Sequence, residues 1–205
     1  MTALIPGLEG SAVHHLWSVR EPRTASQVYL RTRAGSLSGI RRALDRLSRQ
    51  GVVSARTAGN VILYQLNQDH LAYPAIDAAL ARYEPFAELR RRLAELTAAH
   101  ATDLRHEPIV AIYGSVARGD ASSESDLDLL LVLDDDAPEA AGDDLEAALR
   151  THGQRWTGNH VHVFRCSASW LADAHRREDP LVASWLAEAQ VVHGRSLRDE
   201  LAGAS

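Results

Sequence analysis

The residues best suited to chemistry lie between positions 114 and 128. Gly114 and Ser115 follow one apolar run, and Asp126 and Asp128 stand at the start of another. A glycine lets the backbone approach a ligand closely, and backbone N–H groups at a helix start, with a serine hydroxyl, can hold a phosphate. Residues two apart on a strand point to one face, and paired carboxylates there suit Mg²⁺, which prefers oxygen ligands. The spacing therefore indicates phosphate and metal chemistry.

This segment resembles the motif of the nucleotidyltransferase superfamily that includes the minimal nucleotidyltransferases and kanamycin nucleotidyltransferase. The matching residues are Gly114, Ser115, Ala117, Arg118, Gly119, Asp126, Leu127 and Asp128. The resemblance covers about residues 105–195 and implies transfer of a nucleoside monophosphate from a nucleoside triphosphate (NTP) to an acceptor hydroxyl. It implies that Gly114 and Ser115 bind the triphosphate and that Asp126 and Asp128 ligate Mg²⁺. Arg118 then pairs with a phosphate, with the acids, or in a purely structural ion pair.

The sequence departs from that family where a later strand carries a third carboxylate. The segment 158–164 holds no Asp or Glu, and His162 stands about where the acid is expected. A neutral imidazole can accept a proton, since its ordinary pKa is about 6.5, but it is a poor ligand for Mg²⁺. We therefore place His162 with Asp126 and Asp128 in the predicted catalytic set. Alternatively, His160 and His162 are ordinary polar strand residues; their spacing also suggests zinc, but no third ligand is evident nearby in the sequence.

A second group of candidate residues is the set of arginines near the N-terminus. Ser36 can cap a helix that runs to about Gln50 and carries one apolar stripe. The residues expected on its opposite side are Ser38, Gly39, Arg42, Arg46 and Arg49. Arginines on one helical face can meet DNA phosphates and read guanine in the major groove. A hairpin expected after Gly51, with its turn at 57–60, places Arg56 where it could touch phosphate.

Three helices followed by this hairpin resemble a winged helix-turn-helix domain of bacterial transcription regulators, over roughly residues 8–70. The resemblance implies binding of double-stranded DNA, often as a homodimer on two half-sites. Two other interpretations stay open: the arginines form a solvated helix face, or the domain contacts another protein.

The helices and strands that must position these residues are predicted from hydrophobic periodicity and from Gly and Pro turn signals. Residues 71–104 are expected to be a helical connector, interrupted at Pro74 and Pro85. Beyond it, strands alternate with helices, which predicts an α/β domain with a mixed sheet. The expected strands are Ile109–Tyr113, Leu127–Leu133 and His160–Cys166, and the expected helices are Asp143–His152, Ser167–Arg177 and Leu181–Val192. Together with this element order, the two resemblances imply a fold class of two domains: a winged helix-turn-helix at 1–70, mostly helical with a hairpin wing, and an α/β nucleotidyltransferase fold at 105–205.

Composition agrees with two folded domains that have different partners. The 205 residues are 45% hydrophobic and 24% charged, which excludes collagen-like and largely disordered chains. One cysteine, Cys166, excludes a disulfide scaffold and favours the reducing cytoplasm. No apolar run is long enough for a membrane span, and residues 1–10 do not read as a signal peptide. Residues 1–70 hold nine arginines against four acids, whereas the rest of the chain is strongly acidic.

The sequence therefore predicts a DNA-binding protein with a Mg²⁺-dependent nucleotidyltransferase domain, whose third catalytic carboxylate is missing. The alternative is a transcription regulator whose degenerate nucleotidyltransferase domain binds nucleotide or a protein partner without turnover. A third interpretation is an interaction protein similar to the nucleotidyltransferase antitoxins, which neutralises its partner by contact or by nucleotidylation.

Overall fold

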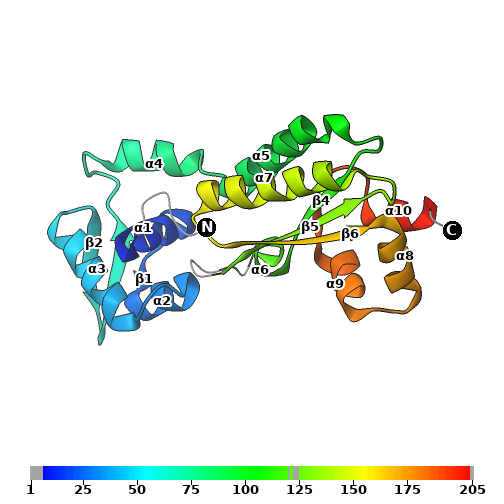
Figure 1. The fold of residues 1–205 in the computed structure, drawn as a ribbon. Coiled ribbons are helices and arrows are strands. Elements are labelled where there is room, and N and C mark those ends of the chain that lie inside the picture. The colour runs from blue at the N-terminus through cyan, green and yellow to red at the C-terminus, as the bar shows by residue number, and fades with distance from the viewer. Residues whose placement is uncertain (1–6, 120, 122–124, 204–205) are drawn as a thin grey trace. The chain divides into compact units, whose positions relative to one another are not determined.

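The computed structural model describes residues 7–119, 121 and 125–203. The chain divides into two compact units, residues 1–84 and 85–205, and each is described by itself (Figure 1).

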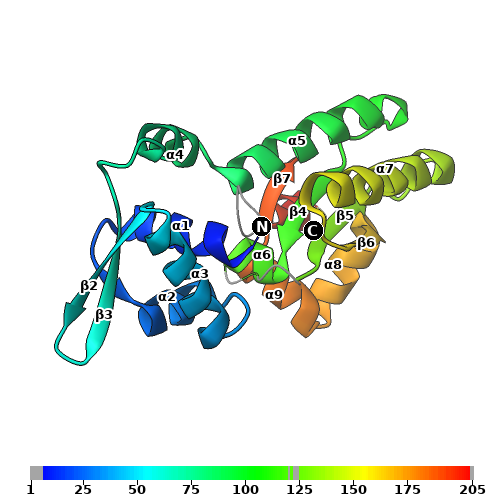
Figure 2. The ribbon, with the colours of Figure 1, turned by 90° about the vertical axis from the view of Figure 1, so that its left-hand side faces the viewer.

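In the first unit, the described residues form four α-helices and a small three-stranded sheet. Its elements are α1 (Leu8–Val19), β1 (Arg23–Thr24), α2 (Ala25–Thr32), α3 (Leu37–Arg49), β2 (Val53–Ala58), β3 (Val61–Leu66) and α4 (Tyr73–Ala81). The strands pair antiparallel in the order β1-β3-β2. β2 and β3 form a hairpin that extends beside the helices (Figure 2).

Local sequence signals account for the limits of these helices. Thr24 and Gln27 form a reciprocal capping box at the start of α2, and the Ser36 hydroxyl accepts a hydrogen bond from the Gly39 backbone at the start of α3. Pro74 lies in the first turn of α4, where its missing N–H leaves no hydrogen bond unmade, so it starts a helix that we had expected it to interrupt.

The hairpin turn is tighter than the sequence suggested. β2 continues to Ala58, which pairs with Val61, so the turn consists of Gly59 and Asn60 alone. Gly59 has a φ of 59°, which a side chain would disfavour. The expected four-residue turn at 57–60 was therefore too long.

The core of the first unit lies between α1, α3 and the sheet. Ile40, Leu44 and Leu47 on α3 are buried with Leu16 of α1 and Tyr64 of β3, as the apolar stripe predicts. The helices expected in a connector at 71–104 divide between the units: α4 packs on this core, and α5 belongs to the second unit.

The second unit is a four-stranded sheet covered by helices. Its elements are α5 (Pro85–His100), a short 3₁₀ turn (Ala101–Asp103), β4 (Ile109–Tyr113), α6 (Gly114–Arg118), β5 (Leu127–Leu133), α7 (Glu139–Thr157), β6 (Val161–Ser167), α8 (Ala168–Arg176), α9 (Pro180–Glu188), β7 (Gln190–His193) and α10 (Leu197–Gly203). The strand order is β6-β5-β4-β7. β5 and β6 are parallel and the other pairs are antiparallel, so the expected mixed sheet is confirmed.

One strand was missed by the sequence analysis. Residues 190–192 were expected to continue a helix, yet they form β7, which pairs with β4. The apolar run is compatible with either element, and only pairing with a distant strand decides between them.

The two faces of the sheet are covered by different helices. Odd-numbered residues of β5 face α7, since a Cβ placed on Gly142 would lie 2.8 Å from Leu133. Even-numbered residues such as Leu130 pack with Leu171 and Trp185 from α8 and α9. Figure 2 shows α5 beside α7 on the other side of the sheet from α8 and α9. β5 is thus buried on both faces, and its one polar residue, Asp128, lies near its N-terminal end.

Candidate functional site

The two halves of the sequence motif meet where β4 enters α6. Gly114 begins α6 with a φ of 71°, a conformation that favours glycine. A Cβ added there would lie 2.6 Å from Oδ2 of Asp128, which is closer than any real contact. A glycine at 114 is therefore required for the Asp128 carboxylate to lie against this turn. Ser115 follows in the same helix and is half-buried.

Strand pairing sets Tyr113, Asp128 and His162 in one row across the sheet. Asp128 pairs with Tyr113 across the antiparallel β4–β5 ladder and with His162 across the parallel β5–β6 ladder. The Tyr113 side chain crosses β5, because its hydroxyl lies 3.5 Å from Nδ1 of His162. Burial, and secondarily the Asp128 charge, raises the pKa of Tyr113 to about 12, so its hydroxyl stays protonated at neutral pH.

The carboxylates stand in different environments. Asp128 is half-buried, and burial raises its pKa above the ordinary value; the Asp126 charge also raises it, while His162 and Arg118 lower it. Asp126 lies just before β5 and is exposed, with its Oδ1 3.9 Å from Nδ1 of His160. These positions give two carboxylates and two imidazoles at one end of adjacent strands, an arrangement that can hold a cation.

Arg118 is engaged within the protein. Its guanidinium donates two hydrogen bonds to Glu188 at the end of α9, at 2.9 and 3.0 Å. Gln190 donates a hydrogen bond to the Ala117 carbonyl, which also ties α6 to this part of the chain. Sequence reasoning missed Glu188, because 70 residues separate it from Arg118 and no local pattern marks it.

Another acidic group lies at the opposite end of β5. Within the described residues, ligand atoms of His106, Asp134 and Asp136 lie within 4.8 Å of one another; Asp126, Asp128 and His162 stand farther apart than this. His106 and Asp136 are exposed and Asp134 is half-buried, and Arg105 approaches Asp136 at 3.4 Å. The acidic run after an apolar strand was the sequence signal for this group, and it was not used.

The predicted DNA-contacting residues of the first unit differ in whether they are paired within the protein. Ser38, Arg42, Arg49 and Arg56 are exposed, and these three arginines form no ion pair with described residues. Arg46 instead bonds Glu9 of α1, with 2.7 Å between its Nε and the Glu9 carboxylate. This hydrogen bond is the main reason that the pKa of Glu9 lies below its ordinary value.

Gly39 corrects one expectation about α3. Helical spacing predicts that it lies on the exposed side, but it is buried, and a Cβ there would lie 2.7 Å from Leu8. The glycine serves close packing of α1 on α3 and not the outer face of α3.

A groove of about 360 Å³ lies between the start of α2, α3 and the start of β3. Its lining includes Arg41 and Asp45, and the Tyr64 hydroxyl donates a hydrogen bond to Asp45 at 3.0 Å. Burial, together with this acid, raises the pKa of Tyr64 to about 12.

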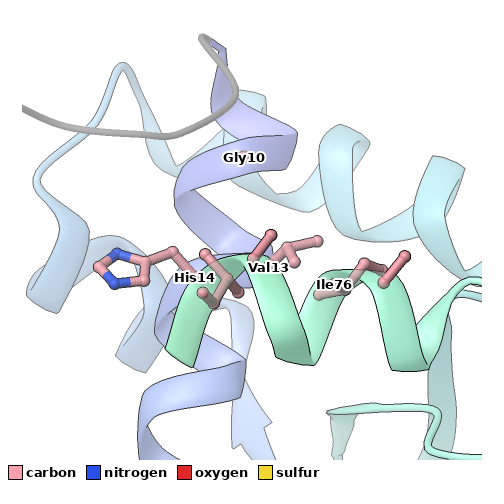
Figure 3. Close-up of a pocket in the computed structure, with 7 residues that line it drawn as sticks. Gly10, Val13, His14 and Ile76 are labelled. Atoms are coloured by element: carbon pink, nitrogen blue, oxygen red, sulfur yellow. The ribbon is translucent and has the colours of Figure 1, made fainter. Parts of the chain in front are cut away.

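A separate pocket of about 220 Å³ lies between α1 and α4 (Figure 3). Its lining is apolar apart from His14, and it consists of Gly10, Val13, His14, Ala75, Ile76, Ala79 and Leu80. It brings together no group of catalytic side chains.

The comparisons with known proteins assign the motif region. Residues 108–190 match the family model described as "Nucleotidyltransferase domain", so this segment, from just before β4 into β7, carries a nucleotidyltransferase domain. A search of the curated proteins found no match. Among solved structures, the chain is similar to one described as "Crystal structure of the toxin-antitoxin with AMP-PNP", at 14% identity and a TM-score of 0.33. That match covers 52% of this chain and 77% of the other, a likeness too low to transfer function. No helix in the described residues is long and apolar enough to cross a membrane.

Proposed function

We propose that this chain transfers a nucleoside monophosphate from an NTP to an acceptor hydroxyl and binds DNA through its first unit. The observation that carries the enzymatic part is the close approach of the Asp128 carboxylate to Gly114, where a Cβ would lie 2.6 Å from Oδ2. It brings together the two halves of a motif that lies inside the matched nucleotidyltransferase segment.

Each residue around the turn between β4 and α6 has a role that follows from its chemistry. The Gly114 backbone and the Ser115 hydroxyl bind the triphosphate, and Asp126 and Asp128 hold Mg²⁺ through carboxylate oxygens, the donors that this ion prefers. When bound, Mg²⁺ neutralises phosphate charge and so supports phosphoryl transfer. His162 completes the catalytic set beside Asp128, at the position where the third carboxylate is expected. Arg118, held by Glu188, fixes α6 and contributes positive charge near Asp128.

The proposed DNA-binding part is a winged helix-turn-helix. It is supported by the element order α1-β1-α2-α3-β2-β3, with the hairpin directly after α3. α3 is the recognition helix, which presents Ser38, Arg42 and Arg49 to the DNA, and Arg56 on the hairpin contacts the phosphate backbone. Arg46 contributes only after release from Glu9. The assignment of 1–70 as this domain, 71–104 as connector and 105–205 as transferase stays a prediction, as do a homodimer and a protein partner.

Transfer is tested with α-labelled NTPs, Mg²⁺ and a panel of acceptors that includes DNA, host protein extract and the chain itself. We expect label transfer with release of pyrophosphate, and its loss on Asp126→Asn and Asp128→Asn. Asp134→Asn is the matched control, since it removes an acid at the opposite end of β5. Absence of transfer with all four NTPs would overturn the enzymatic proposal.

A regulator that binds nucleotide without turnover is the second candidate, and His162 in place of a carboxylate favours it. In that case NTP binds in an Asp128-dependent way, pyrophosphate is not released, and the NTP changes DNA affinity. Coupling must be reciprocal, so DNA must change NTP affinity by the same factor. NTP binding with no effect on DNA affinity would remove this candidate.

DNA binding is tested by selection from random duplexes, followed by salt titration of the selected sequence. Arg42→Ala should weaken binding and lower the salt slope by about 1 if the side chain meets a phosphate. Arg82→Ala is the control, because it removes an exposed arginine at the end of α4, outside the proposed interface. Equal loss in both variants, or binding without sequence preference, would contradict recognition by α3.

A further inference from the structure

We propose that His162 is a metal ligand and that it makes this site selective for a first-row transition-metal dication, such as Mn²⁺, over Mg²⁺. The inference rests on the proposed function only for Asp126 and Asp128 as metal ligands. It gives His162 the role of a metal ligand, where the sequence alone had suggested a proton acceptor.

The register of the sheet supplies the first argument. Asp128 and His162 are partners in the parallel β5–β6 ladder, so their side chains leave the same face of adjacent strands. Adjacent strands are about 4.8 Å apart, so side chains that leave the same face can turn to share one ion. The ligand atoms of Asp126, Asp128 and His162 now stand farther apart than 4.8 Å, so binding requires their side chains to close on the ion. His162 is exposed on β6, an edge strand, so its imidazole can rotate toward the carboxylates.

Tyr113 supplies the second argument, because it can set the tautomer of His162. Its hydroxyl lies 3.5 Å from Nδ1, beyond the roughly 2.7–3.2 Å of an ordinary N–H···O hydrogen bond, so a small shift of the exposed imidazole would form the bond. When Nδ1–H donates to the phenolic oxygen, Nε2 keeps its lone pair for a metal ion. Metal-bound histidines almost always donate their other ring N–H to an oxygen acceptor, and Tyr113 would supply that acceptor here. Tyr113 is thus a positioning residue for the ligand His162.

The donor set supplies the third argument. Mg²⁺ demands six oxygens and gives up water reluctantly, whereas an imidazole nitrogen suits later divalent metals. Mn²⁺ has the charge of Mg²⁺ and also accepts oxygen ligands, so the change in preference between the two ions on His162→Ala reports the effect of the nitrogen donor. His160, beside Asp126, adds a second imidazole at the rim. The sequence pattern His160-x-His162 lacked further ligands, and strand pairing brings in Asp128.

The test is binding of Mn²⁺ to the full chain without nucleotide, measured by the loss of the electron paramagnetic resonance (EPR) signal of free Mn²⁺, with Mg²⁺ as competitor. We expect Mn²⁺ to bind at least about 10-fold more tightly than Mg²⁺. His162→Ala should lose roughly 10-fold or more in Mn²⁺ affinity and little in Mg²⁺ affinity. His162→Asp should tighten Mg²⁺ binding and so reduce the preference for Mn²⁺ over Mg²⁺. Tyr113→Phe should weaken Mn²⁺ binding by up to about 10-fold.

The controls separate this inference from the proposed function. Circular dichroism checks that each variant is folded, and His106→Ala disables the other acidic cluster and should change nothing. If His162→Ala binds Mn²⁺ like the wild type while Asp126→Asn/Asp128→Asn does not bind, the His162 role is wrong and the metal site stands. If the double variant still binds, or if His106→Ala abolishes binding, the metal lies elsewhere and both proposals fail. Equal affinity of the wild type for Mg²⁺ and Mn²⁺ would overturn the proposed selectivity for Mn²⁺.

Discussion

Replacing Gly114 by alanine tests whether contact with Asp128, and not glycine's backbone freedom alone, explains this position. Gly114 has a φ of 71°, and the new Cβ would lie 2.6 Å from Oδ2 of Asp128 but 3.5 Å from its Cγ. Only the carboxylate oxygen is too close, and it is the far end of a side chain that can rotate. The substitution should therefore turn the Asp128 carboxylate away from the turn.

Gly158 provides a matched control. It has a φ of 73° at the end of α7, and a Cβ there would meet nothing within 4 Å. Alanine in this left-handed conformation costs about 1–2 kcal/mol at either position. Since rotating a carboxylate adds little, Gly114→Ala and Gly158→Ala should lower the free energy of unfolding by similar amounts in urea titration.

Function should separate the two variants. A displacement of about 1 Å at a reacting group can cost about 100-fold in rate. We therefore expect Gly114→Ala to lose about two orders of magnitude in nucleotide transfer and to weaken metal binding, with Gly158→Ala close to the wild type. Wild-type metal binding and transfer in Gly114→Ala, or an equal loss in Gly158→Ala, would refute the reasoning.

Three further predictions concern the first unit and the core. Glu9→Gln should release Arg46, tighten DNA binding and steepen its salt dependence by about 1, which salt titration measures. The same variant should cost less than about 1 kcal/mol because the pair is exposed. Because the pKa of Glu9 is lowered in the folded protein, the difference in free energy of unfolding between wild type and Glu9→Gln is present above pH 4.5 and is lost as the pH falls through the lowered pKa. Urea titrations in acid should therefore give the same free energy of unfolding for both proteins. Arg42→Ala and Arg49→Ala together should weaken DNA binding more than either alone, by near-additive amounts in a double-mutant comparison, because neither arginine has an acidic partner among the described residues. Leu130→Ala should lower the free energy of unfolding by about 2–5 kcal/mol, since Leu130 is fully buried under the site, and thermal or urea unfolding checks it.

Patterns that act within a few residues predicted the local structure well. The Thr24 and Ser36 caps and the apolar stripe of α3 involve neighbours along one helix, so the sequence alone specifies them. The same holds for β5, whose continuous apolar run signals burial on both faces. Strand β7 was missed because an apolar run of that length fits a helix equally well.

The sequence by itself determined which residues could do chemistry: the Gly-Ser pair, the two aspartates, and the histidine in place of a third acid. It also placed arginines on the outer side of α3. Only the tertiary structure decided which of these groups meet. Strand register put His162 and Tyr113 beside Asp128, and packing gave Arg46 to Glu9 and Arg118 to Glu188. The physical reason is that pairing between distant strands and ion pairs between helices depend on the folded path of the whole chain, whereas local spacing reports only what neighbouring residues can form.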